Sequence, residues 1–258
     1  MKVLLYDCDG VLGDTEQFGH LVAFNRMWQE FGVPWSWSVE EYGRKLKIGG
    51  GKERMASLFY EPAFLKVFQP PESAEERAEL IASWHKRKSE IYKEIIGTGK
   101  VPPRPGVKRL AREAFEAGWT LGVCSTSAKP SVEAVLKHVM GKELADKFSL
   151  LLAGDMVKDK KPSPEIYNMA ARQLGVSPAD CVVIEDSRNG LLAADGAGMK
   201  CIVTVSGYTR EEEFTEAALV VSSLGDPGGE KCEILLNRCG REPGDHITEA
   251  DLNSILTG

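Results

Sequence analysis

Two aspartates near the start of the chain, Asp7 and Asp9, have the spacing of a paired-carboxylate site. They follow the apolar run Val3–Tyr6, which is short enough to be one buried strand, and Gly10 after them permits a tight turn. Alternation along the strand places both carboxylates on one side, at the carboxyl end, where open α/β sheets bind ligands. Such a pair can hold a hard cation and do chemistry, although an ordinary strand-to-turn junction with two solvated acids has the same pattern.

Three further polar clusters follow apolar runs later in the chain. Ser125 comes directly after one such run, Lys161 precedes a helical segment, and Glu185 and Asp186 end another run. Each has an ordinary explanation, namely a helix cap for the serine, a solvated surface position for the lysine and a complement to a helix N-terminus for the acids. Because the carboxyl ends of parallel strands meet at one edge, we interpret the clusters as one site.

This set of groups suits phosphoryl transfer. Carboxylates together with a phosphate oxygen and water are the ligands that Mg²⁺ prefers. One carboxylate can attack phosphorus to form an aspartyl-phosphate, and a second can act as general acid and base, a contribution of about 10²–10⁴ in rate. Ser125 and Lys161 can bind the transferring phosphoryl group and neutralise it.

The segments that must position these groups alternate in type after residue 103. Strands are expected at 119–124, 150–153, 181–184 and 201–205, and helices at 107–117, 129–140, 189–197 and between the Ser163 cap and Gly175. Strands alternating with helices predict an α/β fold with a doubly wound (Rossmann-like), mostly parallel sheet as its core. We expect this catalytic core to comprise residues 1–16 and 103–225.

Residues 17–102 read as an inserted all-helical cap domain. An apolar stripe at 18–31, a second helix at 39–46, a third after a glycine loop and one or two helices at 73–96 support this prediction. Residues 226–258 are rich in glycine and charge, and we expect a loosely packed C-terminal appendage of unknown role. A helical insert after the first strand would form a lid over the strand ends.

The glycine loop of the cap has the pattern of a second anion site. Gly49–Gly51 are followed by Lys52 and Arg54 at the start of a helix, where backbone N–H groups and basic side chains attract anions. A basic cluster at 85–88 lies later in the same domain. A flexible connector and a solvated helix face are the alternative interpretations. Two anion sites, one on each domain, suggest a substrate with phosphates at both ends.

Composition excludes several classes of protein. The 258 residues are 43% hydrophobic and 27% charged, which is typical of a soluble globular protein. The net charge of −6 argues against a nucleic-acid partner. No apolar run approaches the roughly 20 residues of a membrane span, so no membrane association is expected. A strand that begins at residue 3 leaves no room for a signal peptide.

The six cysteines lack zinc-type spacing. Cys8, Cys124, Cys181 and Cys201 lie in or beside apolar runs and read as small buried hydrophobes, which suits a reducing compartment. Cys232 and Cys239 lie in the polar tail, where both redox control and an unremarkable exposed pair remain open.

In this order, the four clusters resemble the haloacid dehalogenase superfamily, in its phosphatase and phosphomutase branch, and the cap position is similar to that of the β-phosphoglucomutase-like group. The resemblance runs from the first strand to about residue 215. It implies that Asp7 is the nucleophile and Asp9 the general acid and base, with Ser125 and Lys161 at the phosphate site. Mg²⁺ would be bound by Asp7, the Asp9 carbonyl and Asp186, with Glu185 beside it.

The stretch IGGGKERM and the later SGYT also resemble the CbbY group of this superfamily, which is linked to carbon fixation through removal of xylulose 1,5-bisphosphate, an inhibitor of Rubisco. This resemblance implies the following substrate contacts: Glu16, His20, Gly50, Gly51, Lys52, Glu53, Arg54, His85, Arg87, Lys88, Ser125, Thr126, Ser127 and Lys129. The expected protein is a monomeric Mg²⁺-dependent sugar-bisphosphate phosphatase. It would be located in the chloroplast stroma if the source is a photosynthetic eukaryote, and in the cytoplasm otherwise.

Four alternatives remain at this point. A β-phosphoglucomutase-like sugar phosphomutase uses the same chemistry but returns the phosphoryl group to its substrate, and a phosphatase for another small sugar phosphate would share every motif. A dehalogenase acting on carbon–halogen bonds needs neither a metal nor an acid two residues after the nucleophile, so Asp9, Glu185 and Asp186 count against it. A non-enzymatic binding protein on this fold is disfavoured by the intact set of catalytic residues.

Overall fold

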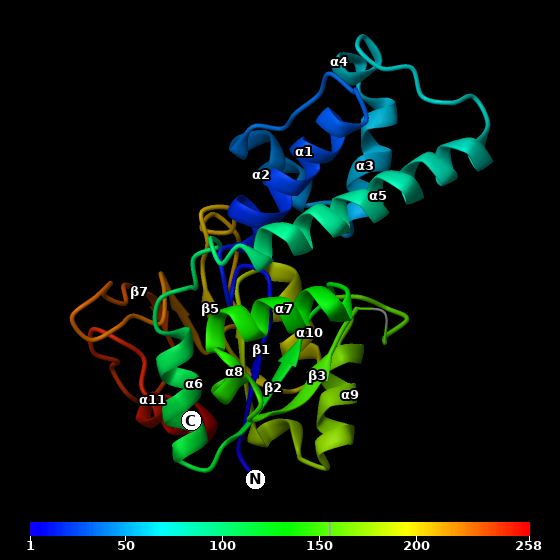
Figure 1. The fold of residues 1–258 in the computed structure, drawn as a ribbon. Coiled ribbons are helices and arrows are strands. Elements are labelled where there is room, and N and C mark those ends of the chain that lie inside the picture. Colours follow the sequence, from blue (N-terminus) through cyan, green and yellow to red (C-terminus); the bar gives the residue numbers. More distant parts are fainter. Residues whose placement is uncertain (155) are drawn as a thin grey trace. The chain divides into compact units, whose positions relative to one another are not determined.

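A computed structural model describes residues 1–154 and 156–258. The chain forms two compact units: Met1–Asp14 with Pro102–Gly258, and Thr15–Val101 between them (Figure 1). We call them the sheet unit and the helical unit, and each is described by itself. Within the described residues, no helix combines the length and apolar content that a bilayer span requires.

The sheet unit contains one seven-stranded sheet in the order β3-β2-β1-β4-β5-β6-β7. Its strands are β1 (Val3–Tyr6), β2 (Thr120–Cys124), β3 (Phe148–Leu152), β4 (Cys181–Glu185), β5 (Lys200–Thr204), β6 (Leu219–Val221) and β7 (Ile234–Asn237). β1 lies parallel between β2 and β4, while β7 is antiparallel to β6. The predicted α/β fold with a mostly parallel, doubly wound sheet is confirmed.

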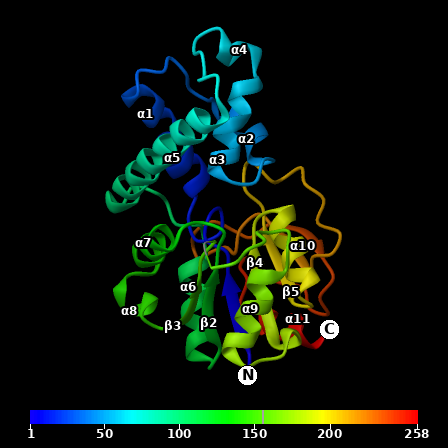
Figure 2. The same cartoon turned by 90° about the vertical axis from the view of Figure 1, so that its right-hand side faces the viewer.

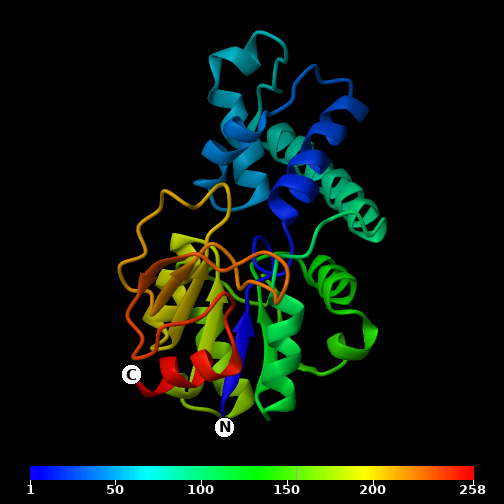
Figure 3. The ribbon, with the colours of Figure 1, turned by 90° about the vertical axis from the view of Figure 1, so that its left-hand side faces the viewer.

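Helices cover both faces of the sheet. Those of this unit are α6 (Val107–Glu116), α7 (Lys129–Met140), α8 (Lys142–Ala145), α9 (Glu165–Leu174), η3 (Pro178–Asp180), α10 (Arg188–Gly196) and α11 (Glu249–Thr257). α9 and α10 contact each other and lie together on one face (Figure 2). α6 and α11 contact each other on the opposite face (Figure 3).

Burial on both faces explains the continuous apolar runs of the strands. In β1, Val3 and Leu5 pack into the cluster under α9 and α10, and Leu4 and Tyr6 are equally buried. The four cysteines expected in the interior are buried, and Cys232 and Cys239 are half-buried. The predicted strands and helices exist where expected. Most boundaries lie within one or two residues of the predicted ones, and α9 begins at Glu165 with Pro164 rather than Ser163 in the N-cap position.

The prediction of a loosely packed tail from residue 226 is wrong. β7 pairs with β6 at the edge of the sheet, and α11 contacts β4 and α6. Leu252 and Ile255 of α11 are buried, and Thr248 forms a capping box with Asp251 at its start. The glycine-rich turns at 225–229 obscure this part of the sequence, and β7, at four residues, is too short to show a strong hydrophobic period.

The helical unit contains η1 (Glu16–Leu21), α1 (Val22–Glu30), α2 (Val39–Leu46), α3 (Gly51–Ser57), η2 (Leu58–Tyr60), α4 (Pro62–Leu65) and α5 (Ala74–Gly97). Residues 73–96, expected as one or two helices, form the single helix α5. The stripe at 18–31 begins as the π-helical turn η1 and continues as α1. Aromatic rings fill the core, with Trp28 and Trp37 packed edge to face at 4.6 Å.

The two connections to the helical unit leave the sheet unit side by side. Asp14 donates its backbone N–H to the carbonyl of Pro102 at 3.0 Å, and Arg104 donates to Leu12 at 3.0 Å. The Arg104 guanidinium also bonds the carbonyls of Val205 and Ser222, at 2.7 and 2.9 Å. The segment after β1 and the segment before α6 are therefore anchored to the residues that directly follow β5 and β6.

Candidate active site

The functional side chains of the sheet unit follow the ends of its central strands. Asp7 continues β1 by donating its N–H to Ile184 at 2.9 Å, and Ser125 continues β2 by donating to Leu152 at 3.0 Å. Glu185 ends β4 and Asp186 follows it. β1 is the point at which the strand order reverses, which is where sheets of this type bind ligands. The structure thus brings together the groups that the sequence places at separate strand ends.

Lys161 joins three of these strand ends. Its ammonium donates to Asp7 Oδ1 at 2.6 Å, to Glu185 Oε1 at 2.6 Å and to the Cys124 carbonyl at 2.8 Å. An ammonium has three N–H donors, so these bonds use all of them. Burial alone would lower the pKa of Lys161, but Asp7 and Glu185 outweigh it and hold that pKa above its ordinary value. Lys161 is therefore a fixed cation that orients the Asp7 carboxylate.

Asp7, Glu185 and Asp186 form a buried group whose carboxylate oxygens lie within 4.8 Å of one another. Lys161 compensates only one of their charges, so a divalent cation fits the remainder of the donor set. Burial raises the pKa of Asp7 to about 8, with Lys161 opposing the rise and Glu185 and Asp9 adding to it. A cation among these oxygens would favour the ionised carboxylate that a nucleophile requires. The residues present thus fit the Mg²⁺ ion that the sequence predicts.

Two glycines leave room for this carboxylate cluster. Gly10 has a φ of 78°, and a Cβ there would lie 2.1 Å from Oδ2 of Asp186. A Cβ at Gly190, in the first turn of α10, would lie 1.9 Å from Oε2 of Glu185. Gly10 is therefore required by its backbone conformation and by a close approach, while Gly190 is required by the approach alone.

Asp9 has a different set of contacts from Asp7. Its Oδ2 accepts a hydrogen bond from Ser127 Oγ at 2.5 Å, and the Ser127 N–H in turn donates to Ser125 Oγ at 3.1 Å. Ser125 is buried, whereas Thr126 and Ser127 are half-buried. The loop after β2 therefore contacts the predicted general acid and base through Ser127, and phosphate binding by this loop stays a prediction. Lys129, also predicted there, is an exposed residue at the start of α7.

Sequence reasoning missed Gly154 and Tyr167. A Cβ at Gly154 would lie 2.0 Å from the Thr126 carbonyl, so this glycine lets the loop after β3 approach the loop after β2. The Tyr167 hydroxyl donates to Glu185 Oε1, the same oxygen that Lys161 bonds. The available signal was the position of Tyr167 in the first turns of the helix that follows Lys161, on its buried face.

In the helical unit, Lys88 and His20 form a buried polar pair. Lys88 Nζ lies 2.6 Å from His20 Nδ1, and the His20 ring stacks on Tyr92 at 4.1 Å. Lys88 Nζ also lies 4.6 Å from the centre of the Phe24 ring and 5.3 Å from that of Tyr92. α1 and α5, which pack together, supply Phe24, Lys88 and Tyr92, and η1 supplies His20. Two of the predicted substrate contacts are thus brought together here.

Glu16 and Arg54 converge on Tyr42 in the same unit. The Tyr42 hydroxyl donates to Glu16 Oε2 at 2.5 Å, and Arg54 Nη1 donates to the Tyr42 hydroxyl at 3.2 Å. Arg54 Nε also bonds the carbonyl of Ile48 at 2.9 Å, which ties the guanidinium to the glycine loop. In the described part of the chain, Arg54 forms no ion pair with a carboxylate, so its charge is available to an anion.

The other predicted cap contacts are more scattered. A Cβ at Gly51 would lie 3.4 Å from the His85 ring, whereas Lys52 and Glu53 are exposed. A Cβ at Gly50 would lie 2.0 Å from Oε2 of Glu53, which therefore folds back over the loop. Arg87 lies apart from these residues and forms ion pairs with three glutamates, Glu30, Glu90 and Glu94. The structure does not bring Arg87 together with the other predicted contacts.

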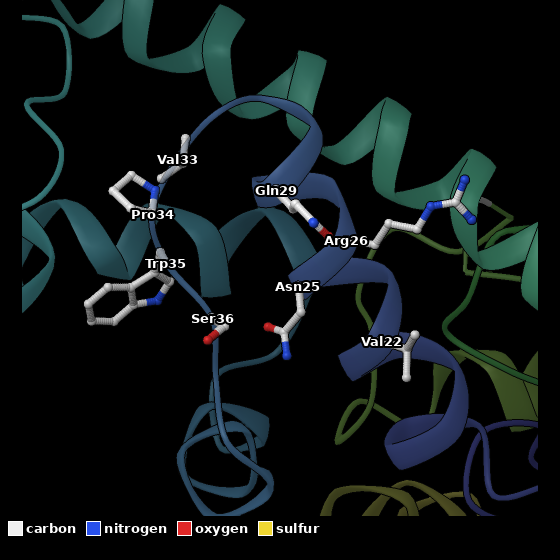
Figure 4. Close-up of a pocket in the computed structure, with 8 residues that line it drawn as sticks. All are labelled: Val22, Asn25, Arg26, Gln29, Val33, Pro34, Trp35 and Ser36. Carbon is white, nitrogen blue, oxygen red and sulfur yellow. The ribbon is translucent and has the colours of Figure 1, made fainter.

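A pocket of about 620 Å³ lies elsewhere in the helical unit (Figure 4). Asn25 and Gln29 of α1 line it together with Val33 and Trp35 of the following loop. Its lining includes no predicted site residue. Asn25 uses its amide to bond the backbone of Trp37, at 2.9 and 2.8 Å, which is a structural role. This pocket is therefore separate from the groups described above.

Comparisons with known proteins agree with this arrangement. A family model described as haloacid dehalogenase-like hydrolase matches residues 1–198. A CBBY-like protein of Arabidopsis thaliana is 46% identical over 239 residues, covering 93% of this chain and 73% of the relative. Protein CbbY of Cereibacter sphaeroides is 40% identical over 233 residues, covering 89% of this chain and 95% of the relative.

A solved structure extends the similarity to the fold. The crystal structure of a CbbY mutant from Rhodobacter sphaeroides in complex with xylulose 1,5-bisphosphate matches with a TM-score of 0.77 and 39% identity, covering 89% of this chain and 97% of that one. The match spans both the sheet unit and the inserted helical unit. The buried carboxylates at the ends of β1 and β4, the lysine that joins them and these relatives together show that the chain belongs to the haloacid dehalogenase-like hydrolases, as a phosphatase of the CbbY type.

Proposed function

We propose that this phosphatase is Mg²⁺-dependent, acts through an aspartyl-phosphate on Asp7, and removes a phosphate from xylulose 1,5-bisphosphate. The observation that carries the choice of substrate is the similarity, over almost the full length of both chains, to a CbbY structure that contains this bisphosphate. The observation that carries the chemistry is the buried Asp7 carboxylate held by Lys161.

In the proposed reaction, an oxygen of Asp7 attacks phosphorus while the bond from phosphorus to the sugar oxygen breaks. Asp9 gives its proton to the departing sugar oxygen. Asp9 then accepts a proton from the water that attacks the aspartyl-phosphate, which regenerates the Asp7 carboxylate and releases phosphate. Lys161 supports both steps by holding Asp7 in one orientation, and the Ser127 hydroxyl orients Asp9.

Mg²⁺ would be held by Asp7, Asp186 and the main-chain carbonyl of Asp9, with Glu185 beside them. When bound, the ion supplies positive charge for the phosphoryl oxygens and lowers the repulsion between phosphate and the Asp7 carboxylate. Support comes from the charge of the buried cluster, which one lysine compensates only in part. Ser125 and the loop after β2 would bind the transferring phosphoryl group.

The helical unit would bind the other phosphate of the substrate. Arg54 is the best-supported contact, because its guanidinium is anchored by Ile48 and Tyr42 and forms no ion pair within the described residues. Lys88 and His20 would add further polar groups of the same unit, and the glycine loop would contribute backbone N–H groups at the start of α3. Positively charged side chains on both units favour a bisphosphate substrate over a monophosphate substrate.

A phosphate-release assay with a panel of sugar phosphates tests this function. We expect the highest kcat/KM with xylulose 1,5-bisphosphate, lower values with other sugar bisphosphates and the lowest with a small generic phosphate ester. EDTA should stop release, and Mg²⁺ should restore it. Conversion of β-glucose 1-phosphate to glucose 6-phosphate, dependent on a bisphosphate primer, would instead identify a phosphomutase. A preference for a sugar monophosphate would reject the bisphosphate assignment.

We also propose that the protein acts as a monomer in the chloroplast stroma if its source is a photosynthetic eukaryote, and in the cytoplasm otherwise. Relatives from a plant and from bacteria both match this chain, so the source of the protein decides between the two locations. Light scattering at micromolar concentration and fractionation of source cells test the two statements separately.

A further inference from the structure

Tyr167 of α9 touches both members of the ion pair at the base of the active site. Its side chain is fully buried, and its hydroxyl donates to Glu185 Oε1. Its ring lies against the Lys161 ammonium, with Nζ 5.0 Å from the ring centre. One aromatic residue thus supplies a hydrogen bond to the carboxylate and a cation–π contact to the ammonium.

The two carboxylate oxygens of Glu185 have different hydrogen-bond partners. Oε1 receives both the Lys161 ammonium at 2.6 Å and the Tyr167 hydroxyl. Oε2 accepts the main-chain N–H of Asp186 at 3.4 Å, and Gly190 leaves the space that the Glu185 carboxylate occupies. Without the tyrosine hydroxyl, Lys161 alone would hold Oε1, and the carboxylate could rotate about its final bond.

We propose that Tyr167 is a positioning residue for the metal site. Its hydroxyl fixes the orientation of Glu185 so that one oxygen balances Lys161 and the other stays on the main-chain N–H of Asp186, a carboxylate of the group that would bind Mg²⁺. Its ring restrains Lys161 and, through it, Asp7. This inference rests on the proposed Mg²⁺-dependent function and adds a residue that touches neither the ion nor the substrate.

Tyr6 offers a matched control in the same unit. It is also fully buried and precedes Asp7 in β1, but its hydroxyl has no hydrogen-bond partner among the described residues. Tyr167→Phe and Tyr6→Phe therefore remove the same atom from the same kind of environment. Only the first removes a hydrogen bond to the active-site cluster, so a difference between the variants reports on that bond.

The experiment measures Mg²⁺ binding to the substrate-free protein by calorimetry, for wild type, Tyr167→Phe and Tyr6→Phe. Outer-sphere partners of metal ligands typically change metal affinity by about 10–100-fold, so we expect Tyr167→Phe to raise the Kd for Mg²⁺ by about tenfold. Tyr6→Phe should leave it unchanged. The Mg²⁺ concentration for half-maximal phosphate release should shift by the same factor in Tyr167→Phe.

Two results would overturn the proposal. One is an unchanged Kd for Mg²⁺ in Tyr167→Phe together with a lowered melting temperature in EDTA, because the hydroxyl would then only stabilise the fold. The other is an equal shift in Tyr6→Phe, which would attribute the effect to packing. If Tyr167→Phe does not fold, Tyr167→Met gives the second test, with a Kd raised at least as much. Failure of the wild type to bind Mg²⁺ would instead reject the proposed function.

Discussion

Two lysines with shielded side chains, Lys161 in the sheet unit and Lys88 in the helical unit, are held in different ways. Lys161 bonds two carboxylates and a carbonyl, which fix all three of its N–H groups. Lys88 bonds the imidazole of His20 and lies against the rings of Phe24 and Tyr92. The positive charge of Lys161 is neutralised by the two carboxylates, and its fixed hydrogen bonds make it part of a rigid reaction centre. The second lies beside an imidazole and among aromatic rings, an environment that suits recognition more than chemistry.

The largest expected effect is the loss of the nucleophile. Asp7→Asn removes the oxygen anion that attacks phosphorus, and we expect kcat to fall by at least about 10⁴-fold. The amide occupies the same volume and can still accept a bond from Lys161, so circular dichroism should show an intact fold. Asp146→Asn, at an exposed position, is the control and should retain full turnover. Substantial turnover in Asp7→Asn would assign the chemistry to another residue.

Replacing each buried lysine by methionine tests the comparison directly. Lys161→Met leaves Asp7 and Glu185 buried without their counter-charge, and breaking such a pair costs about 3–5 kcal/mol of unfolding free energy. Lys88→Met places an apolar side chain against aromatic rings, so we expect a smaller loss of stability and an increase in KM. Urea denaturation of both variants, with exposed Lys142→Ala as control, measures the difference. Equal losses of stability would mean that the two lysines play the same role.

A glycine of the sheet unit and a glycine of the helical unit also differ, in how closely other side chains approach them. Gly10 in the sheet unit and Gly32 in the helical unit both have positive φ, 78° and 68°, but only Gly10 has a side chain against it. Gly32→Ala should cost about 1–2 kcal/mol in stability from backbone strain alone and leave kinetics unchanged. Gly10→Ala should cost more, because its Cβ would displace Asp186, and should weaken Mg²⁺ binding. Unchanged Mg²⁺ affinity in Gly10→Ala would show that Asp186 can move without loss.

The sheet-unit site could be predicted from the sequence because its residues are tied to strand ends. Asp7, Ser125, Glu185 and Asp186 each follow an apolar run, and a parallel sheet leaves little choice about where such runs end. Tyr167 could not be predicted in the same way. A tyrosine on the buried face of a predicted helix indicates core packing. The hydrogen bond from its hydroxyl to Glu185 can be recognised only in the folded structure, where the two residues meet.

In the helical unit, the secondary structure could be predicted but the functional contacts could not. Its helices could be predicted, but which side chains face each other could not, because helix crossings decide whether Arg54 and Glu16 meet at Tyr42. Arg87 illustrates the limit: in sequence it belongs to a basic cluster with Lys88, yet one residue of rotation, about 100° on a helix, places it among surface glutamates. The C-terminal strand escaped prediction because β7 spans only Ile234–Asn237 and has one neighbour.

Arg54→Ala tests recognition by the helical unit. Loss of a guanidinium that bonds a phosphate removes a charge-assisted hydrogen bond of about 1.5–3 kcal/mol, so we expect KM for the bisphosphate to rise by at least about tenfold. The KM for a generic phosphate ester should not change, because such a substrate lacks the second phosphate. Steady-state kinetics on both substrates give the ratio. Equal increases for both would assign Arg54 a structural role.

The smallest effect is expected for Arg87→Ala, although Arg87 belongs to the same basic cluster as Lys88. Its guanidinium is engaged by Glu30, Glu90 and Glu94, so an anionic substrate would have to compete with three carboxylates for it. Because surface substitutions usually change free energies by at most about 0.5 kcal/mol, KM for the bisphosphate should stay within about twofold of wild type. A tenfold rise in KM would show that the glutamates release Arg87 when substrate binds. Arg87 would then be a recognition residue like Lys88 rather than part of the surface charge of α5.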